Sequence, residues 1–184
     1  MNILHLKQAV KICEEGGVIA YPTESVFGLG CLLIYEHSVL RILSLKRRSI
    51  KKGLICVAAN IEQLGDYVDL QKVPDLEMVT NSWPGPVTWL IPARFDTPYW
   101  LTGEHNTLAV RVSANPVVRT LCEHLGPIVS TSANPQERAP AYNAQRVRSY
   151  FQDKLDYVIP GILNPGQKPT EIRDAMTGKI IRIS

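Results

Sequence analysis

The chain has 184 residues, of which 45% are hydrophobic and 20% charged, and its formal net charge is +3. This length suits one domain, and the composition argues against disorder, coiled coil and collagen-like structure. The longest apolar runs, at residues 53–59 and 87–93, are far shorter than the roughly 18–20 residues that cross a bilayer, and no signal segment opens the chain. We therefore expect a single domain over residues 1–184, in the cytoplasm and without membrane contact.

The first elements along the chain are predicted from the spacing of apolar residues. A helical face followed by Gly16 and Gly17 indicates an amphipathic helix that ends at a glycine. The apolar run at residues 18–21 predicts a buried strand, a second helical face predicts a helix that reaches Lys46, and residues 54–58 predict another strand. The two faces comprise Leu6, Ala9, Val10 and Cys13, and then Val39, Ile42, Leu43 and Lys46.

The second half of the chain alternates predicted helices and strands. A helix over residues 74–82 is stopped by the Trp-Pro-Gly-Pro stretch that follows, since proline lacks an amide donor and restricts the residue before it. Asn143 is typical of a helix N-cap, and the helix it begins runs to about Gln152. A further helix is predicted at 116–125, and strands at 87–91, 107–112, 127–131, 157–159 and 179–183. The pattern predicts an α/β fold with a mixed sheet covered by helices.

Several common sites are excluded by the sequence. It contains no GxxxxGK[ST] phosphate loop, no HExxH, no GxSxG and no complete dinucleotide fingerprint. The histidines lack ligand spacing and are interpreted as surface or packing residues, and the cysteines form no CxxC pair and are interpreted as buried thiols. We therefore expect no protein-bound metal. These residues are His5, His37, His105 and His124, and Cys13, Cys31, Cys56 and Cys122.

A basic segment and a hydroxyl-rich segment each follow a predicted element. No Asp or Glu lies between His37 and Ile61, whereas Arg41, Lys46, Arg47, Arg48, Lys51 and Lys52 all lie there. These cations could neutralise a polyphosphate, but the pattern also fits a solvated face or a general nucleic-acid patch. Residues 22–30 offer hydroxyls, a carboxylate and two glycines after a buried strand, which fits either a ligand loop or a simple turn.

Two further polar clusters accompany the predicted strands. Arg111 lies within an apolar strand, where a guanidinium needs an anionic partner, so it either pairs with an internal carboxylate or faces a ligand. Residues 130–135 place three hydroxyls and an amide at a strand end, which could hold a small polar substrate or cap the next segment. Ends of strands are where α/β sheets usually bind their ligands.

Taken in order, these segments resemble the YrdC/TsaC family of bacterial L-threonylcarbamoyladenylate synthases. The likeness covers the chain from about Ile3 to Arg182. The matching motifs are PTESVFGLG at 22–30, Lys46-x-Arg48 with Lys52-Gly53-Leu54-Ile55, WPGPVT at 83–88, LAVRV at 108–112, STSAN at 130–134 and PTEIRDA at 169–175. No single motif is specific, but the ordered set is.

The resemblance implies a fold and an activity. It implies a single-domain, YrdC-like α/β fold with a twisted sheet and a basic concave cavity. The family makes threonylcarbamoyl-AMP from L-threonine, bicarbonate and ATP with release of pyrophosphate, and a downstream threonylcarbamoyl-transferase complex passes the group to tRNA. Mg²⁺ is expected to arrive with ATP. The alternatives are an RNA-binding module for tRNA or double-stranded RNA, with little or no catalysis, and a nucleotide-binding protein that has lost its chemistry.

The resemblance also implies roles for individual residues. Lys46, Arg48 and Lys52 would be catalytic, screening the repulsion between two anionic reactants. Arg111 would hold the threonine carboxylate, with Ser25 and Ser132 also contacting the amino acid. The ATP-binding residues would be Arg48, Lys52, Thr88, Ser113, Ser130, Asn134, Asn143 and Arg182.

Overall fold

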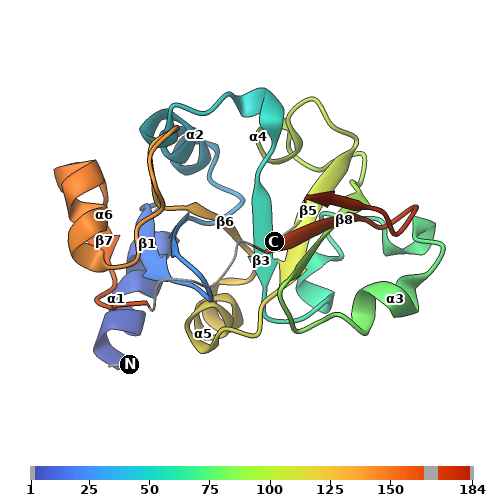
Figure 1. Cartoon of the computed structure of the whole chain (residues 1–184), viewed down its shortest axis with the longest axis horizontal. Coiled ribbons are helices and arrows are strands. Elements are labelled where there is room, and N and C mark those ends of the chain that lie inside the picture. The colour runs from blue at the N-terminus through green and yellow to red at the C-terminus, as the bar shows by residue number, and fades with distance from the viewer. Residues whose placement is uncertain (1–2, 164–169, 183–184) are drawn as a thin grey trace.

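One mixed sheet runs through the molecule (Figure 1). The computed structural model describes residues 3–163 and 170–182. Within these ranges nine strands follow the order β7-β1-β2-β6-β3-β5-β4-β8-β9. The strands are β1 (Ile19–Pro22), β2 (Phe27–Gly30), β3 (Ile55–Ala58), β4 (Val87–Pro92), β5 (Thr107–Val112), β6 (Ile128–Ser132), β7 (Tyr157–Val158), β8 (Glu171–Asp174) and β9 (Ile180–Arg182).

The sheet confirms the prediction of a mixed α/β fold. β1 pairs with β7, β3 with β5, and β4 with β8 in parallel, whereas the remaining neighbours are antiparallel. β6 is antiparallel to both of its neighbours, and its Ser132 lies opposite Gly28 of β2 while its Ser130 lies opposite Ile55 of β3. The hydroxyl-rich end of β6, at residues 130–132, is therefore placed near the middle of the sheet.

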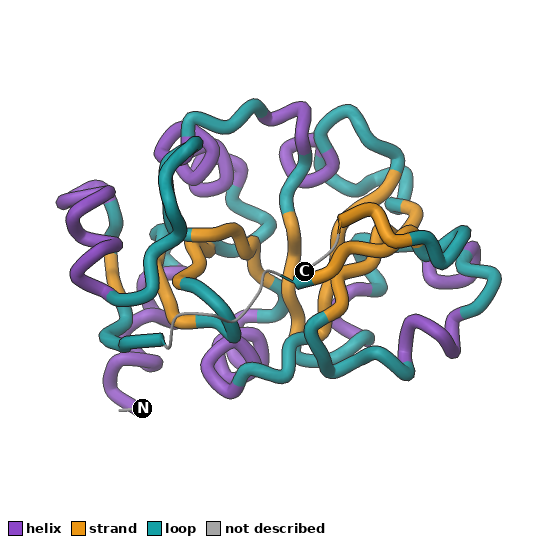
Figure 2. Tube along the Cα trace, in the orientation of Figure 1, coloured by secondary structure: helices purple, strands orange, loops and turns teal. Residues whose placement is uncertain are grey.

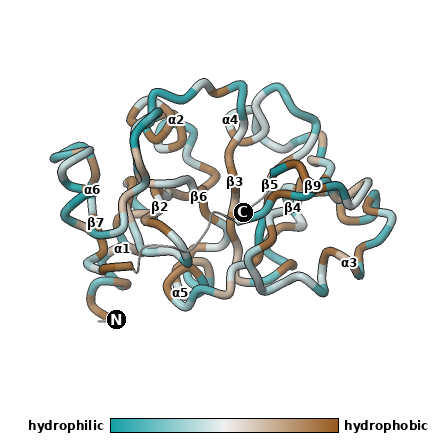
Figure 3. Tube along the Cα trace, viewed as in Figure 1, coloured by the Kyte–Doolittle hydropathy of each residue, from teal (hydrophilic) through white to brown (hydrophobic). Residues whose placement is uncertain are grey.

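Helices cover both faces of this sheet (Figure 2). They are α1 (Ile3–Glu14), α2 (Glu36–Lys46), α3 (Leu76–Thr80), α4 (Tyr99–Thr102), α5 (Pro116–Leu125) and α6 (Ala144–Phe151). Side chains alternate along a strand, so Ile19 and Tyr21 of β1 pack with α1 and α5, while Ala20 packs in the cluster on the opposite face. The hydropathy colouring shows β3 as hydrophobic along its length, which agrees with its central position (Figure 3).

Most predicted elements are present, with ends displaced by a residue or two. The helix at 116–125 and the strand at 107–112 are confirmed with the predicted bounds, and Asn143 accepts a hydrogen bond from the amide of Arg146 as the N-cap of α6. The helix predicted at 74–82 is shorter, spanning Leu76–Thr80. The last predicted strand is β9, although residue 183 lies outside the described residues.

Among the α-helices and strands, β2, α4 and β8 were not predicted. None of the helices in the described part of the chain is both long and apolar enough to cross a membrane.

Candidate active site

A cavity of about 660 Å³ lies over one face of the sheet, next to the part covered by α5. Thr107, Ala109 and Arg111 alternate along β5, so all three point to this face, and all three line the cavity. The neighbour of Arg111 on β3 is Val57, which packs against α5. Arg111 is therefore placed at the border between the apolar core and the cavity.

Basic side chains from distant segments gather around this cavity. Its lining includes Lys46, Arg48, Lys52, His105, Arg111 and Arg182, and no Asp or Glu of residues 3–163 and 170–182 is part of it. Such a set makes the cavity attractive to anions. The basic segment after α2 and the hydroxyl-rich segment of β6 thus belong to one site.

Lys46 lies at the C-terminal end of α2 and is 6% exposed. Its Nζ donates hydrogen bonds to the backbone oxygen of Ser132 and, at 2.9 Å, to that of Asn134, and it lies 3.4 Å from Ser132 Oγ. The backbone oxygen of Lys46 accepts from the amide of Gln136. Burial, with a smaller contribution from Arg48, lowers the pKa of Lys46 to about 8. Lys46 therefore holds residues 132–136 in place through hydrogen bonds and adds a positive charge to the cavity.

Arg48 and Arg182 approach the cavity from opposite ends of the sequence. Arg48 Nη2 donates to the backbone oxygen of Gly53 at 3.0 Å, and its buried Nε has no hydrogen-bond partner. Arg182 Nη2 donates to the backbone oxygen of Thr170 at 2.9 Å. Desolvation lowers the pKa of both guanidinium groups, and nearby positive charge lowers it further: that of Arg182 for Arg48, and that of Arg111 for Arg182. Mutual repulsion of this kind favours the binding of an anion between them.

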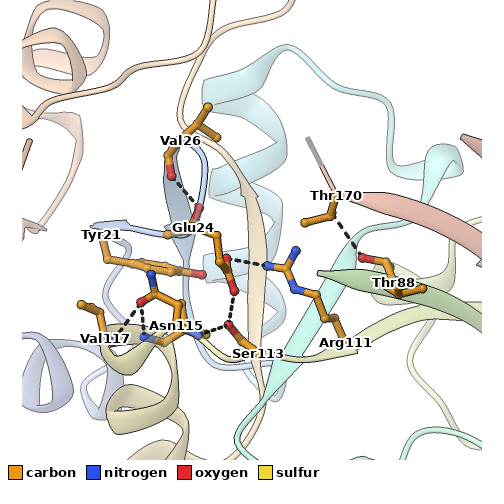
Figure 4. A network of polar contacts seen from close by, with 12 residues as sticks. Tyr21, Glu24, Val26, Thr88, Arg111, Ser113, Asn115, Val117 and Thr170 are labelled. Carbon is orange, nitrogen blue, oxygen red and sulfur yellow. Dashed lines mark hydrogen bonds and ion pairs between the residues drawn. The ribbon is translucent and has the colours of Figure 1, made fainter. Parts of the chain in front are cut away.

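From the sequence, Arg111 was expected either to pair with an internal carboxylate or to face a ligand. In the structure it has an internal carboxylate partner and also lines the cavity. It is 5% exposed, and its Nη2 lies 3.4 Å from Glu24 Oε2 (Figure 4). Ser113 donates a short hydrogen bond to the other carboxylate oxygen. The buried Nε of Arg111 has no partner. One guanidinium nitrogen is thus engaged by the protein, while donor capacity remains for a ligand.

Ser25, Ser130, Ser132 and Asn134 also line the cavity, as the resemblance implied. Asn134 Nδ2 donates to the backbone oxygens of Pro135 and Arg138, which closes the turn after β6. Its Oδ1 is buried and has no hydrogen-bond partner. A buried acceptor without a donor is costly, so this oxygen is available to a donor group of a ligand.

Three of the expected nucleotide-binding residues, Thr88, Ser113 and Asn143, are not among the residues that line the cavity. Thr88 is fully buried on β4, and its Oγ1 lies 3.4 Å from Oγ1 of Thr170, which does line the cavity. Ser113 is also fully buried and donates to Glu24. The Asn143 side chain caps α6. Each of the three has a contact within the protein. That of Asn143 is local and agrees with its predicted place as an N-cap, whereas those of Thr88 and Ser113 join residues far apart in the sequence.

Backbone contacts with the α4 region, which were not predicted, hold the basic segment in place. The 3-10 turn η1 (Ile50–Lys52) is joined to the α4 region by two backbone bonds, from the Leu54 amide to the Leu101 oxygen and from the Glu104 amide to the Lys51 oxygen. Gly53 and Gly103 have φ values of +60° and +63°, and a Cβ on either would press into the backbone of the opposite segment. The glycines therefore permit the close approach that places Lys52 and His105 on one wall.

Comparison with known proteins identifies the family. The Sua5/YciO/YrdC model, described as "Telomere recombination", matches residues 11–184. Threonylcarbamoyl-AMP synthase of Pseudomonas aeruginosa is 49% identical over 176 residues, which cover 95% of this chain and 94% of that protein. The chain belongs to the Sua5/YciO/YrdC family. The synthase of Coxiella burnetii is 42% identical over 179 residues, covering 97% of this chain and 96% of that protein.

Solved structures agree with this membership of the Sua5/YciO/YrdC family. The crystal structure of P. abyssi Sua5 complexed with L-threonine matches with a TM-score of 0.86 and 30% identity, covering 95% of this chain and 52% of that one. The chain thus spans about half the length of P. abyssi Sua5. E. coli YciO matches with a TM-score of 0.78 and 29% identity over 92% of this chain and 82% of that chain.

The cavity of this family member does not fit a metal ion held by protein ligands. Mg²⁺ prefers carboxylate and water oxygens, and no carboxylate is among the described residues of the lining. Nor does the described part of the chain contain a group of His, Cys, Asp and Glu side chains arranged to hold a metal ion.

Proposed function

We propose that this chain is a threonylcarbamoyl-AMP synthase that uses L-threonine, bicarbonate and ATP and releases pyrophosphate. The observation that carries this proposal is the convergence of Lys46, Arg48, Arg111 and Arg182 on one cavity, in a chain that matches curated synthases over nearly its whole length. The threonine complex of P. abyssi Sua5 supports the choice of amino acid.

The proposed reaction joins two anions. The amino group of threonine combines with carbon dioxide, supplied by bicarbonate, and loses a proton to give a carbamate. A carbamate oxygen then bonds to the α-phosphorus of ATP, the bond from that phosphorus to the bridging oxygen breaks, and pyrophosphate leaves. Because both reactants are negatively charged, catalysis depends on positioning and on positive charge around the phosphates. The basic cavity meets this requirement.

The side chains divide between the two reactants. Arg111 would hold the threonine carboxylate, for which the fork of a guanidinium is suited, and Ser25 and Ser132 would contact the amino acid. The phosphates and the nucleoside would lie against the other lining residues, with Lys46, Arg48 and Lys52 closest to the reacting phosphate. These other residues are Ser130, Asn134 and Arg182. Mg²⁺ would enter bound to ATP rather than to the protein, since the lining offers it no carboxylate.

The product would pass to a downstream threonylcarbamoyl-transferase complex that modifies tRNA, and the protein would work in the cytoplasm, where ATP and tRNA are available. The RNA-binding alternative is less well supported. Lys46 and Arg111 are only 6% and 5% exposed, so the phosphates of a folded RNA would not reach them. A small anionic substrate would.

The test is pyrophosphate release by the purified protein with ATP, Mg²⁺, bicarbonate and L-threonine. We expect release to require threonine and bicarbonate, and to be much slower when serine replaces threonine. Release at the same rate without threonine would show that the substrate is wrong. ATP binding without any release would favour a nucleotide-binding protein that lacks chemistry, and RNA binding that survives physiological salt in the same preparation would favour the RNA-binding module.

A further inference from the structure

Glu24 is an unexpected residue to find beside this cavity. Its carboxylate, with a side chain 23% exposed, lies 3.4 Å from a guanidinium nitrogen of Arg111. A negative charge at this point lowers the attraction of the cavity for anionic ligands. The same carboxylate supplies the anionic partner that the buried guanidinium of Arg111 needs, and the contacts of Glu24 determine the orientation in which the two groups meet.

The carboxylate of Glu24 is itself held in place. Ser113 donates to Glu24 Oε1, and the Ser113 Oγ accepts from the Asn115 amide at 3.1 Å. Because the hydroxyl has one hydrogen and receives a donor from Asn115, that hydrogen is directed at Glu24. Asn115 Oδ1 in turn accepts from the amides of Val117 and Val118 at the start of α5. The carboxylate is thus connected to the end of a helix (Figure 4).

The partners of Glu24 have a fixed spacing. Arg111 and Ser113 lie two residues apart along and just beyond β5, so their side chains point to the same face. Glu24 comes from the turn between β1 and β2 and contacts both, one with each oxygen. Oε1 is fixed by the hydroxyl, and Oε2 is thereby directed at Arg111 Nη2.

We propose that Glu24 is a positioning residue that holds the guanidinium of Arg111 in the orientation from which it binds an anion in the cavity. The buried Nε of Arg111 has no hydrogen-bond partner, whereas its Nη2 is held by Glu24. A long side chain held at one nitrogen loses less conformational freedom when a ligand binds. The proposal applies to whichever anion Arg111 binds. Under the proposed function that anion is threonine.

The variant Glu24→Gln separates positioning from simple electrostatics, because the two predict opposite changes. Glutamine keeps the size and the ability to accept from Ser113, but it removes the charge. If Glu24 only reduces the positive potential, its neutralisation tightens anion binding. If Glu24 positions Arg111, its neutralisation weakens the binding of the ligand that Arg111 holds.

The experiment is calorimetric titration of L-threonine and of ATP, each into the purified protein and its variants. Arg111→Ala first identifies which ligand depends on Arg111. For that ligand we expect Glu24→Gln to weaken binding about tenfold, as for lost charge-assisted contacts, and Ser113→Ala to weaken it less. Binding of the other ligand stays within about twofold, which a general loss of structure would not produce.

A matched control is Asp156→Asn. Asp156 accepts from Arg41 at 2.6 Å and from the amide of Val18, so it also joins separate elements through an ion pair, but neither of its partners lines the cavity, whereas Arg111 does. We expect this variant to lower the melting temperature without changing either affinity. In an Arg111→Lys background, Glu24→Gln should have no further effect, because Glu24 acts through the guanidinium.

Unchanged or tighter binding of the Arg111-dependent ligand in Glu24→Gln overturns the proposal. The proposal is also overturned if Arg111→Ala leaves both affinities unchanged, because Arg111 would then bind neither anion and Glu24 could not position it for one. These outcomes are distinct from failure of the proposed function, which appears in the wild-type protein as pyrophosphate release that does not depend on threonine.

Discussion

Lys46 Nζ donates a hydrogen bond of 2.9 Å to the backbone oxygen of Asn134, and so connects the end of α2 to the turn after β6. A second bond from the same ammonium reaches the backbone oxygen of Ser132. The ammonium group therefore donates to the protein itself and not to a ligand. Lys46 therefore contributes its charge to the cavity while it sets the position of the residues around Asn134.

The variant Lys46→Met tests both contributions. Methionine keeps much of the apolar length but removes the ammonium that donates to the backbone oxygens of Ser132 and Asn134. We expect ATP to bind at least about tenfold more weakly, because the cavity loses a positive charge and the residues around Asn134 lose hydrogen bonds that contribute roughly 1.5–3 kcal/mol to holding them in place. The measurement is calorimetric titration with ATP, and the control is Lys72→Met, which removes an exposed lysine paired with Asp69. Equal affinities for the two variants would remove Lys46 from the site.

The lowered pKa of Lys46 predicts a pH dependence. Burial lowers this pKa to about 8, so the ammonium loses its proton as the pH rises through that value, and the cavity loses a positive charge. We expect ATP affinity to fall between about pH 7.5 and 9 in the wild type, where the phosphates stay fully ionised. The fall should be absent in Lys46→Met, and parallel curves for the two proteins would assign it to another group.

Gly103 and Gly126 form a pair of sites for testing the close approach between the α4 region and the basic segment. Both have positive φ, +63° and +75°, but a Cβ on Gly103 would collide with the backbone oxygens of Ile50 and Lys51, whereas a Cβ on Gly126 has nothing within 4 Å. Gly126→Ala should cost only backbone strain, about 1–3 kcal/mol. Gly103→Ala should cost more and also weaken ATP binding, because it displaces the segment that carries Lys52. Chemical denaturation and ATP titration measure the two effects, and equal losses of stability would contradict the close approach.

The thiols should be unreactive in the folded protein. Cys13, Cys31, Cys56 and Cys122 are each 0% exposed. Burial raises the pKa of every one of them, to about 12 for Cys13 and Cys122, so almost no thiolate is present near neutral pH. We expect negligible alkylation under native conditions and labelling of all four after unfolding in urea, followed by mass spectrometry. Rapid native labelling of any of them would show that its surroundings open.

The fold was predictable where local signals agreed with one another. The helix α5 begins with Pro116 after an Asn115 cap and ends at Gly126, so both of its ends were visible in the sequence. The strand β2 was not visible, because Gly28 and Gly30 are typical of a turn. The structure supplies their reason: a Cβ on Gly30 would lie 2.7 Å from the Tyr21 ring and from the Val129 oxygen. Similarly, β8 has no apolar run and is a strand through its pairing with β4.

The site was predictable in its cationic and hydroxyl side chains but not in its internal partners. Lys46 and Arg48 were noted as part of a basic segment and Arg111 as a guanidinium within an apolar strand. Their roles were implied by the family resemblance, and the cavity brings the three together. Whether a polar side chain faces a ligand or another residue depends on contacts far apart in sequence. The contact of Ser113 with Glu24 could not be predicted for this reason, whereas the contact of Asn143 with the amide of Arg146 is local and was predicted as an N-cap.

The lining of the cavity is drawn from both ends of the polypeptide, from Thr23 in the turn after β1 to Arg182 in β9. During translation the early segments leave the ribosome well before the β8–β9 hairpin that carries Arg182. A nascent chain, or a proteolytic fragment that lacks this hairpin, would hold only part of the cavity lining. The full set of lining cations would come together only once the final strands have joined β4.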